Sequence, residues 1–170
     1  MPDPLTVTRI SRQLTALSVR HRTGPEWYLA LAGDLSSEAC ATIADARRHA
    51  TANGRAETAG RVVAELPFGS WRYLLASRYE RTFWRTGLYW AFPGQGRRQA
   101  VYTRLAGIHQ LRNRIAHHEP IHNRPLARLH DDALLVAEWA CPGTRTWIAA
   151  RSAAPRLLAS RPQPTSLTSP

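Results

Sequence analysis

The chain concentrates its histidines in a short segment that also carries arginines. Five of its seven histidines lie between His109 and His130, and the stretch from His109 to His122 reads HQLRNRIAHHEPIH. Imidazole exchanges a proton near neutral pH and is also a common metal ligand. Arginine supplies a permanent, planar cation that matches phosphate. The segment could therefore bind a metal, cleave a phosphodiester without a metal, or form a charged surface.

A metal site is suggested by His118, Glu119 and His122, which match the H-E-x-x-H pattern of zinc proteases. In that pattern the two histidines lie four residues apart on one helix face. Pro120 lies between them here, and a proline inside a helix costs about 3 kcal/mol because it lacks a donor and clashes one turn back. We therefore expect His122 beyond the end of a helix, and we expect no metal and no cofactor.

Metal-free cleavage of RNA fits the spacing better. On a helix, Asn113 and His117 share one face, His109 extends that face by one turn, and Arg112 lies at the edge of the apolar face. Attack by the 2′-hydroxyl of RNA needs a neutral imidazole to take a proton and a cation to stabilise the phosphorane. It also needs a polar group that orients the substrate. His117, Arg112 and Asn113 can fill these three roles.

The alternative for the same segment is structural. Histidines near a helix C-terminus interact favourably with the helix dipole, and neighbouring arginines can simply be solvated. This interpretation stays open for four arginines in particular, namely Arg97, Arg98, Arg124 and Arg128.

The string from Leu111 to Ile121 resembles the signature of the Abi-like (abortive infection) proteins of the HEPN superfamily. The core of that signature is R-N-x-x-x-H, here Arg112, Asn113 and His117. The similarity covers roughly residues 35–150. It includes four further strings: ELPFGSWR at 65–72, RYE at 78–80, FW at 83–84 and AFP at 91–93.

This resemblance implies an all-α, HEPN-like helical bundle that dimerises through its motif helices, so that two copies of the Arg and the His converge on one site. Many members are metal-independent ribonucleases that act as toxins or in antiviral defence. If the roles of the family motif are transferred to this chain, Arg112 and His117 are catalytic and Asn113 supports them. His118 is the alternative base, because the doubled histidine makes the spacing ambiguous by one. The implied partners are RNA, a second copy of the chain, and an antitoxin or a non-coding RNA.

The resemblance also implies helices before the position of Arg9–Ser18 that this chain lacks. We therefore expect residues 1–33 to be the remnant of a shortened N-terminal part, residues 34–152 to be the HEPN-like domain, and residues 153–170 to be a disordered tail rich in Pro, Ser and Thr. Such shortening leaves a second hypothesis, a catalytically inactive domain that binds RNA or another protein.

The motif needs a helix, and the hydrophobic pattern predicts one from Arg97 to His118. Its apolar stripe consists of Val101, Leu105, Ile108, Leu111 and Ile115. Capping residues and Pro or Gly breaks predict further helices over residues 9–19, 34–53, 57–66, 71–89, 129–139 and 142–150, with a loop at 21–25. In this scheme Asp34, Ser36 or Ser37 caps the second of these helices, which stops at Asn53 and Gly54. Ser70 caps the helix over 71–89, and Asp131 and Asp132 lie at the start of the helix over 129–139.

Eight of the fourteen aromatic residues lie between Trp71 and Phe92, interleaved with arginines such as Arg72 and Arg78. Such aromatics could stack on nucleobases, but packing in the core or in an interface is the interpretation that we favour. We also expect Glu80 to pair with an arginine, with Arg112 as the candidate, because an ion pair would fix the guanidinium.

The composition favours an anionic partner. The chain has 23 arginines, no lysine and 12 acids, which gives a net charge of +11. Seven of those arginines and a single acid lie between Arg97 and Arg128. We expect Arg97, Arg98, Arg104 and Arg114 to bind RNA.

We expect the protein to be cytoplasmic. Two distant cysteines, Cys40 and Cys141, indicate a reducing compartment rather than a disulfide framework. The sequence shows no secretory signal and no apolar run long enough to span a membrane.

Overall fold

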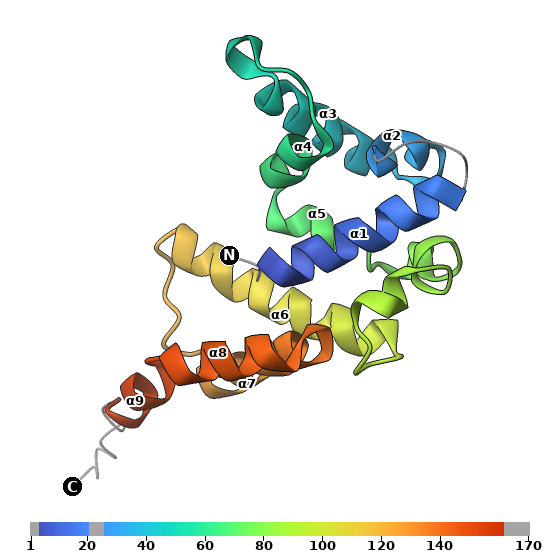
Figure 1. Ribbon diagram of the computed structural model, residues 1–170. Coiled ribbons are helices and arrows are strands. Elements are labelled where there is room, and N and C mark those ends of the chain that lie inside the picture. The colour runs from blue at the N-terminus through green and yellow to red at the C-terminus, as the bar shows by residue number, and fades with distance from the viewer. Residues whose placement is uncertain (1–3, 21–25, 162–170) are drawn as a thin grey trace, which may run out of the picture.

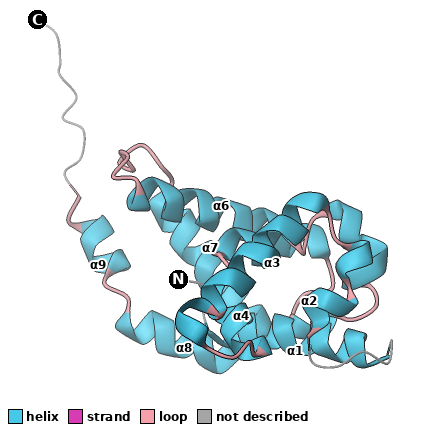
Figure 2. Cartoon of the chain, turned by 90° about the horizontal axis from the view of Figure 1, so that it is seen from above, coloured by secondary structure: helices cyan, strands magenta, loops and turns pink. Residues whose placement is uncertain are grey.

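The computed structural model describes residues 4–20 and 26–161, and these residues form helices, turns and loops without a strand (Figures 1 and 2). The longer helices are α1 (Pro4–Arg20), α3 (Ser37–Ala50), α6 (Arg98–Ala116), α7 (Leu126–Ala140) and α8 (Pro142–Arg151). The shorter ones are α2 (Trp27–Ala30), α4 (Ala59–Glu65), α5 (Phe68–Tyr73) and α9 (Ala154–Ala159). The predicted all-α class is confirmed. Within the described residues, no helix combines the length and the apolar character needed to cross a membrane.

The helices form two groups with α1 between them (Figure 1). Helices α3 and α4 pack together as an arm, and α6, α7 and α8 pack in sequence on the other side. Helix α1 contacts α2 and α7, and its Ile10 and Leu14 are buried in the same core as Trp27 and Phe83. The residues before Asp34 therefore contribute directly to the core.

Local sequence signals explain the ends of α3. The Ser36 hydroxyl accepts a hydrogen bond from the backbone N–H of Ala39, as expected for an N-cap. Beyond the helix, Asn53 and Gly54 have φ angles of 61° and 72°, in the left-handed region that Asn and Gly tolerate best. The predicted cap and the predicted stop are both confirmed.

The helix predicted over residues 71–89 is wrong. Helix α5 ends at Tyr73, with Ser70 inside it, and is followed by short 3₁₀ or π turns at Ser77–Tyr79, Glu80–Trp84 and Leu88–Ala91. Ala76 is extended, with ψ of 158°, and the N–H of Arg85 bonds to the carbonyl of Glu80 five residues back. These turns bury side chains that one helix face could not bury together, namely Tyr79, Phe83, Trp84, Leu88 and Phe92.

Three other boundaries differ from the prediction. Helix α1 is longer than the expected 9–19, and α7 begins at Leu126, so that Asp131 and Asp132 lie in its second turn rather than at its start. Helix α9 forms at the beginning of the segment expected to be a disordered tail. The predicted loop at 21–25 and the rest of that tail, residues 162–170, lie outside the described residues.

Candidate active site

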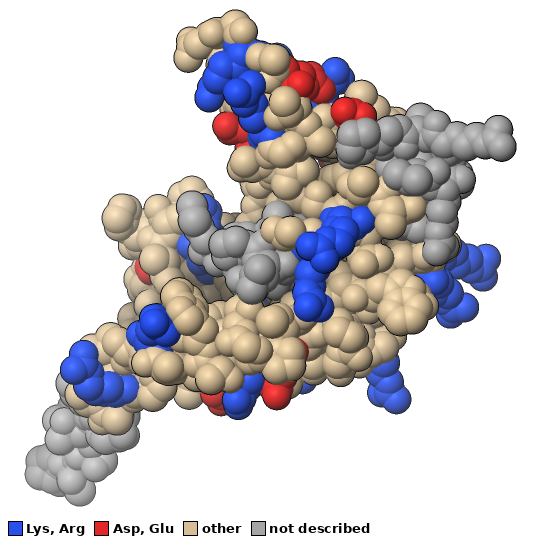
Figure 3. All heavy atoms as spheres, in the orientation of Figure 1, with Lys and Arg blue, Asp and Glu red and all other residues tan. Residues whose placement is uncertain are grey.

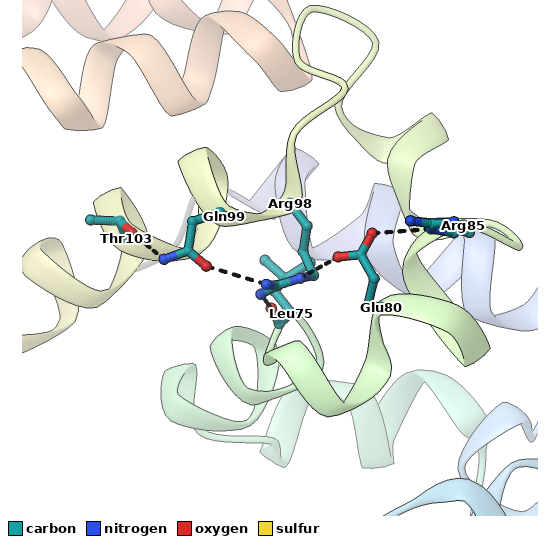
Figure 4. Close-up of polar contacts among 6 residues, drawn as sticks. All are labelled: Leu75, Glu80, Arg85, Arg98, Gln99 and Thr103. Carbon is teal, nitrogen blue, oxygen red and sulfur yellow. Dashed lines mark hydrogen bonds and ion pairs between the residues drawn. The ribbon is translucent and has the colours of Figure 1, made fainter.

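The start of α6 is held by a buried arginine (Figure 4). Arg98 is 8% exposed, and its Nε donates to Glu80 Oε2 at 2.7 Å while its Nη1 donates to the Leu75 carbonyl at 2.6 Å. Glu80 also pairs with Arg85 at 3.3 Å. The hydrogen bond from Arg98 lowers the pKa of the Glu80 carboxyl, and Arg85 contributes to the same effect. This network ties α6 to the turns after α5.

At this end of the helix the prediction that Glu80 pairs with an arginine is confirmed, but the partner differs from the candidate. Glu80 pairs with Arg98, whose Cα lies about 20 Å along the helix axis from that of Arg112 at 1.5 Å per residue. The expected pair of Glu80 with Arg112 is therefore absent. Arg98 was expected to bind RNA, but its guanidinium is buried and already bonded to a carboxylate and a carbonyl.

The apolar stripe of α6 leaves the core towards the C-terminal end. Val101 is 0% exposed and Leu105 is 7% exposed, whereas Ile115 is 53% exposed. In Figure 1 the C-terminal end of α6 extends beyond the helices that cover its first turns. The predicted stripe therefore faces the core at Val101 and Leu105 but not at Ile115, because no described element covers the last turn.

The end of α6 adopts a left-handed cap. His117 is the C-cap, and its N–H donates to the Asn113 carbonyl four residues back at 2.9 Å. His118 has a φ of 55°, and the N–H groups of His118 and Glu119 bond to the carbonyls of Ile115 and Arg114. This pair of bonds is a Schellman motif, in which glycine is the usual left-handed residue.

The zinc-protease geometry is absent at this cap. His118 and His122 both lie in the loop between α6 and α7, so they do not share a helix face. The prediction that His122 lies beyond the helix is confirmed. Among the described residues, no group of three or more His, Cys, Asp or Glu side chains is arranged to hold a metal ion.

The R-N-x-x-x-H residues lie together at the exposed end of α6. The Arg112 Nη1 lies 3.4 Å from Asn113 Oδ1, and His117 begins the following turn. Arg112, His117 and His118 are exposed, and Asn113 is half-buried. Solvent or a substrate can therefore reach both the guanidinium and the imidazoles.

The arginines of α6 differ in their partners. Arg104 pairs with Asp132 at 3.0 Å and lies over the Trp139 ring, and Arg114 pairs with Glu119 at 3.2 Å. Arg98 is bonded to Glu80, as described above. Within the described part of the chain, Arg112 is the one arginine of α6 that no carboxylate neutralises.

His109 lies one helical turn before Arg112, in a more enclosed setting. Its ring meets the edge of Phe68 at a centroid distance of 5.3 Å. Burial lowers the pKa of His109 below its usual value, and the nearby positive charges of Arg72 and Arg112 lower it further. These surroundings favour the neutral form of its imidazole.

Sequence reasoning missed the partner that holds Arg72 beside this helix. The Arg72 Nη1 donates to the Tyr102 hydroxyl at 2.9 Å, and the guanidinium carbon lies 4.5 Å from the centre of the Tyr73 ring. The sequence showed Arg72 only as one of several arginines among aromatics. Tyr102 is thirty residues away in another helix, so no spacing rule could have paired them.

The positive charge is less concentrated than the sequence suggested. Arg97 is exposed, but it precedes α6 and its Cα lies about 30 Å along the helix from that of His117. On the face shown in Figure 3, the arginines lie in separate groups with uncharged surface between them. Of the four arginines expected to bind RNA, Arg98 is buried, Arg104 and Arg114 are paired with acids, and only Arg97 is free of an acidic partner among the described residues.

Comparisons with known proteins leave the family of the chain open: no protein-family model matches it, and neither the curated proteins nor the solved structures contain a significant match.

Proposed function

We propose that this protein is a metal-independent RNA endonuclease of the HEPN type. The observation that carries the proposal is the exposed group at the end of α6. It contains an arginine without an acidic partner among the described residues, an adjacent amide and two accessible imidazoles. A phosphodiester is a suitable ligand for such an arginine, because the guanidinium fork matches two phosphate oxygens.

In the proposed reaction, the 2′-oxygen of RNA attacks the adjacent phosphorus and the 5′-oxygen leaves. His117 takes the proton of the 2′-hydroxyl as general base. Arg112 stabilises the additional negative charge on the phosphorane, and Asn113 orients the guanidinium or the phosphate. A second imidazole or water returns a proton to the leaving 5′-oxygen. The products are a 2′,3′-cyclic phosphate and a 5′-hydroxyl.

We propose a homodimer as the active form. Ile115 is 53% exposed and lies between Arg114 and the cap of α6. An apolar side chain in the middle of a polar, functional surface is typical of a contact with another molecule. A second copy packed on this end of α6 would cover Ile115 and bring two copies of Arg112 and His117 towards one site.

The proposed biological role is defence of a cell against a virus or action as a toxin, with RNA as the target. Both roles require cytoplasmic localisation and a means of control, such as an antitoxin or a non-coding RNA. The two described cysteines, Cys40 and Cys141, are free thiols, which agrees with a reducing compartment.

An RNA-binding domain without catalysis is the second candidate. It is favoured by the His117 ring, which forms no hydrogen bond to any described residue that would orient it for proton transfer. In this alternative Arg112 still binds phosphate, but no bond is broken.

One assay distinguishes the ribonuclease from the RNA-binding domain without catalysis. Purified protein is incubated with single-stranded RNA in excess EDTA, beside the variants His117→Ala and Arg112→Ala. We expect the wild type to cleave and both variants to lose cleavage by at least about a hundredfold, the usual contribution of a general base or of a preorganised cation.

His122→Ala is the matched control, because His122 is an exposed histidine of the same loop outside the motif. Binding without cleavage by the wild type would select the second candidate. Cleavage that requires a divalent metal would contradict the proposal.

A further inference from the structure

A cavity lies between α3, α5, the turn at Ser77–Tyr79 and α6. Its volume is about 450 Å³, within the range of small-molecule sites. Trp27, Ile43 and Leu74 contribute apolar surface, and three tyrosines line it as well, namely Tyr73, Tyr79 and Tyr102. Tyr73 is 55% exposed, so part of this aromatic lining is open to a ligand.

The cavity also offers hydroxyl groups that can form further hydrogen bonds. The side chains of Ser70 and Ser77 line it and form no hydrogen bond with any described residue. Tyr79 is buried at its wall, and its hydroxyl oxygen accepts the N–H of Ser36 at 2.9 Å, which leaves the phenolic proton to donate. Aromatic surface combined with a few hydroxyls suits a planar heterocycle that carries its own donors and acceptors.

Arg72 connects this cavity to the candidate active site. Its guanidinium bonds to the hydroxyl of Tyr102 at 2.9 Å and lies over Tyr73, and both tyrosines line the cavity. The positive charge of Arg72 also acts on His109 and lowers its pKa, as does that of Arg112. Arginine and histidine side chains therefore lead from the cavity to the end of α6.

We infer that this cavity binds one nucleobase of the RNA strand whose phosphates lie along Arg72 and Arg112. The inference rests on the proposed function, since it takes RNA as the substrate. Tyrosine faces stack on any base, and arginines beside them bind the connecting phosphates. A purely apolar ligand would leave the hydroxyls of Ser70 and Ser77 unpaired, and a ligand without an anionic group would leave Arg72 and Arg112 uncompensated.

Binding is measured separately from cleavage by using a ten-nucleotide, single-stranded 2′-O-methyl RNA, which has no 2′-hydroxyl to attack. A ten-unit abasic phosphate strand and a nucleoside monophosphate are the comparison probes. Ala39→Trp fills the cavity from α3, and Ala41→Trp is the matched control because Ala41 is exposed on the same helix outside the cavity.

We expect the wild type and Ala41→Trp to bind the base-bearing strand at least about fivefold more tightly than the abasic strand, as stacking of one base predicts. In Ala39→Trp this preference disappears. Tyr73→Ala, an exposed substitution that preserves the core, reduces it, whereas Trp90→Ala, an exposed aromatic elsewhere, leaves it unchanged.

An unchanged base preference in both Ala39→Trp and Tyr73→Ala would overturn the inference, and so would a monophosphate that binds as tightly as the strand. These outcomes are independent of the proposed catalysis. If the wild type cleaves RNA and the cavity variants keep the wild-type preference for the base-bearing strand, the cavity inference alone fails. If base-dependent binding needs the cavity but no RNA is cleaved, the proposed enzyme alone fails.

Discussion

His109 and His117 carry the same imidazole in different surroundings. His109 packs edge-on against Phe68 and is influenced by the positive charges of Arg72 and Arg112, whereas His117 is exposed at the end of α6. The sequence predicts that both histidines lie on one helix face, because this depends only on their spacing along the chain. It could not show the enclosure of His109, because Phe68 and Arg72 come from another helix.

The lowered pKa of His109 predicts a pH-dependent stability. Below pH 6.5, the ordinary value, the unfolded chain binds a proton at His109 that the folded chain resists. The contribution to stability is complete above that value and is lost as the pH falls through the folded-state pKa. Urea unfolding between pH 7.5 and 5 should therefore show a smaller loss of stability on acidification for His109→Gln than for the wild type. Parallel pH profiles for the two proteins would contradict this account.

Helix α6 is fixed at one end and exposed at the other. Arg98 anchors its first turn to Glu80 and Leu75, and His118 closes its last turn in a left-handed conformation. Both ends decide where Arg112 and His117 lie, so substitutions there test how the motif is positioned.

Loss of the anchor should destabilise the protein. Glu80→Ala leaves the buried guanidinium of Arg98 without its carboxylate, and we expect a loss of about 2 kcal/mol in unfolding free energy. Arg85→Ala removes the exposed partner of the same carboxylate and should cost under about 1 kcal/mol. Thermal and urea unfolding of both variants check this, and equal effects would show that the buried pair is not the anchor.

The cap offers a stabilising substitution. A left-handed φ of 55° costs a side chain such as His118 about 1 kcal/mol relative to glycine, so His118→Gly should raise the unfolding free energy by about that amount. His118→Ala keeps the Cβ atom and should give no gain in unfolding free energy.

The same His118→Gly variant tests which histidine is the base. If His117 is the base, His118→Gly retains RNA cleavage, whereas loss of cleavage in a stable His118→Gly would identify His118 as the base.

Structural features that depend on neighbouring residues could be predicted from the sequence. Features that depend on residues distant in the sequence could not. The cap at Ser36 and the stop at Asn53 and Gly54 act over a few residues and were predicted correctly. The segment after Tyr73 was predicted as one helix, but its shape follows from burying aromatics against distant parts of the chain. The partner of Glu80 was unpredictable for the same reason, since Arg98 lies 18 residues away across a chain of turns.

At the scale of the whole molecule, the proposed active form is a homodimer in which two copies of Arg112 and His117 share one site. Ile115 should therefore belong to a dimer interface. We expect light scattering to give about twice the 19.0 kDa of one chain for the wild type. Ile115→Glu should be monomeric and unable to cleave, because an exposed position tolerates the charge but a dimer interface does not.

Leu157→Glu is the matched control, since Leu157 is 62% exposed on α9 and should leave the dimer intact. A wild-type protein that cleaves RNA at concentrations where it is strictly monomeric would contradict the composite site.

The most direct test of the central claim is the chemical identity of the RNA ends after cleavage in excess EDTA. Mass spectrometry of a defined single-stranded RNA should detect a 2′,3′-cyclic phosphate on one fragment and a 5′-hydroxyl on the other. Neither fragment should form with His117→Ala or with a strand carrying 2′-deoxyribose throughout. A 3′-hydroxyl paired with a 5′-phosphate, or fragments that appear only when a divalent metal is restored, would contradict attack by the 2′-hydroxyl at Arg112 and His117.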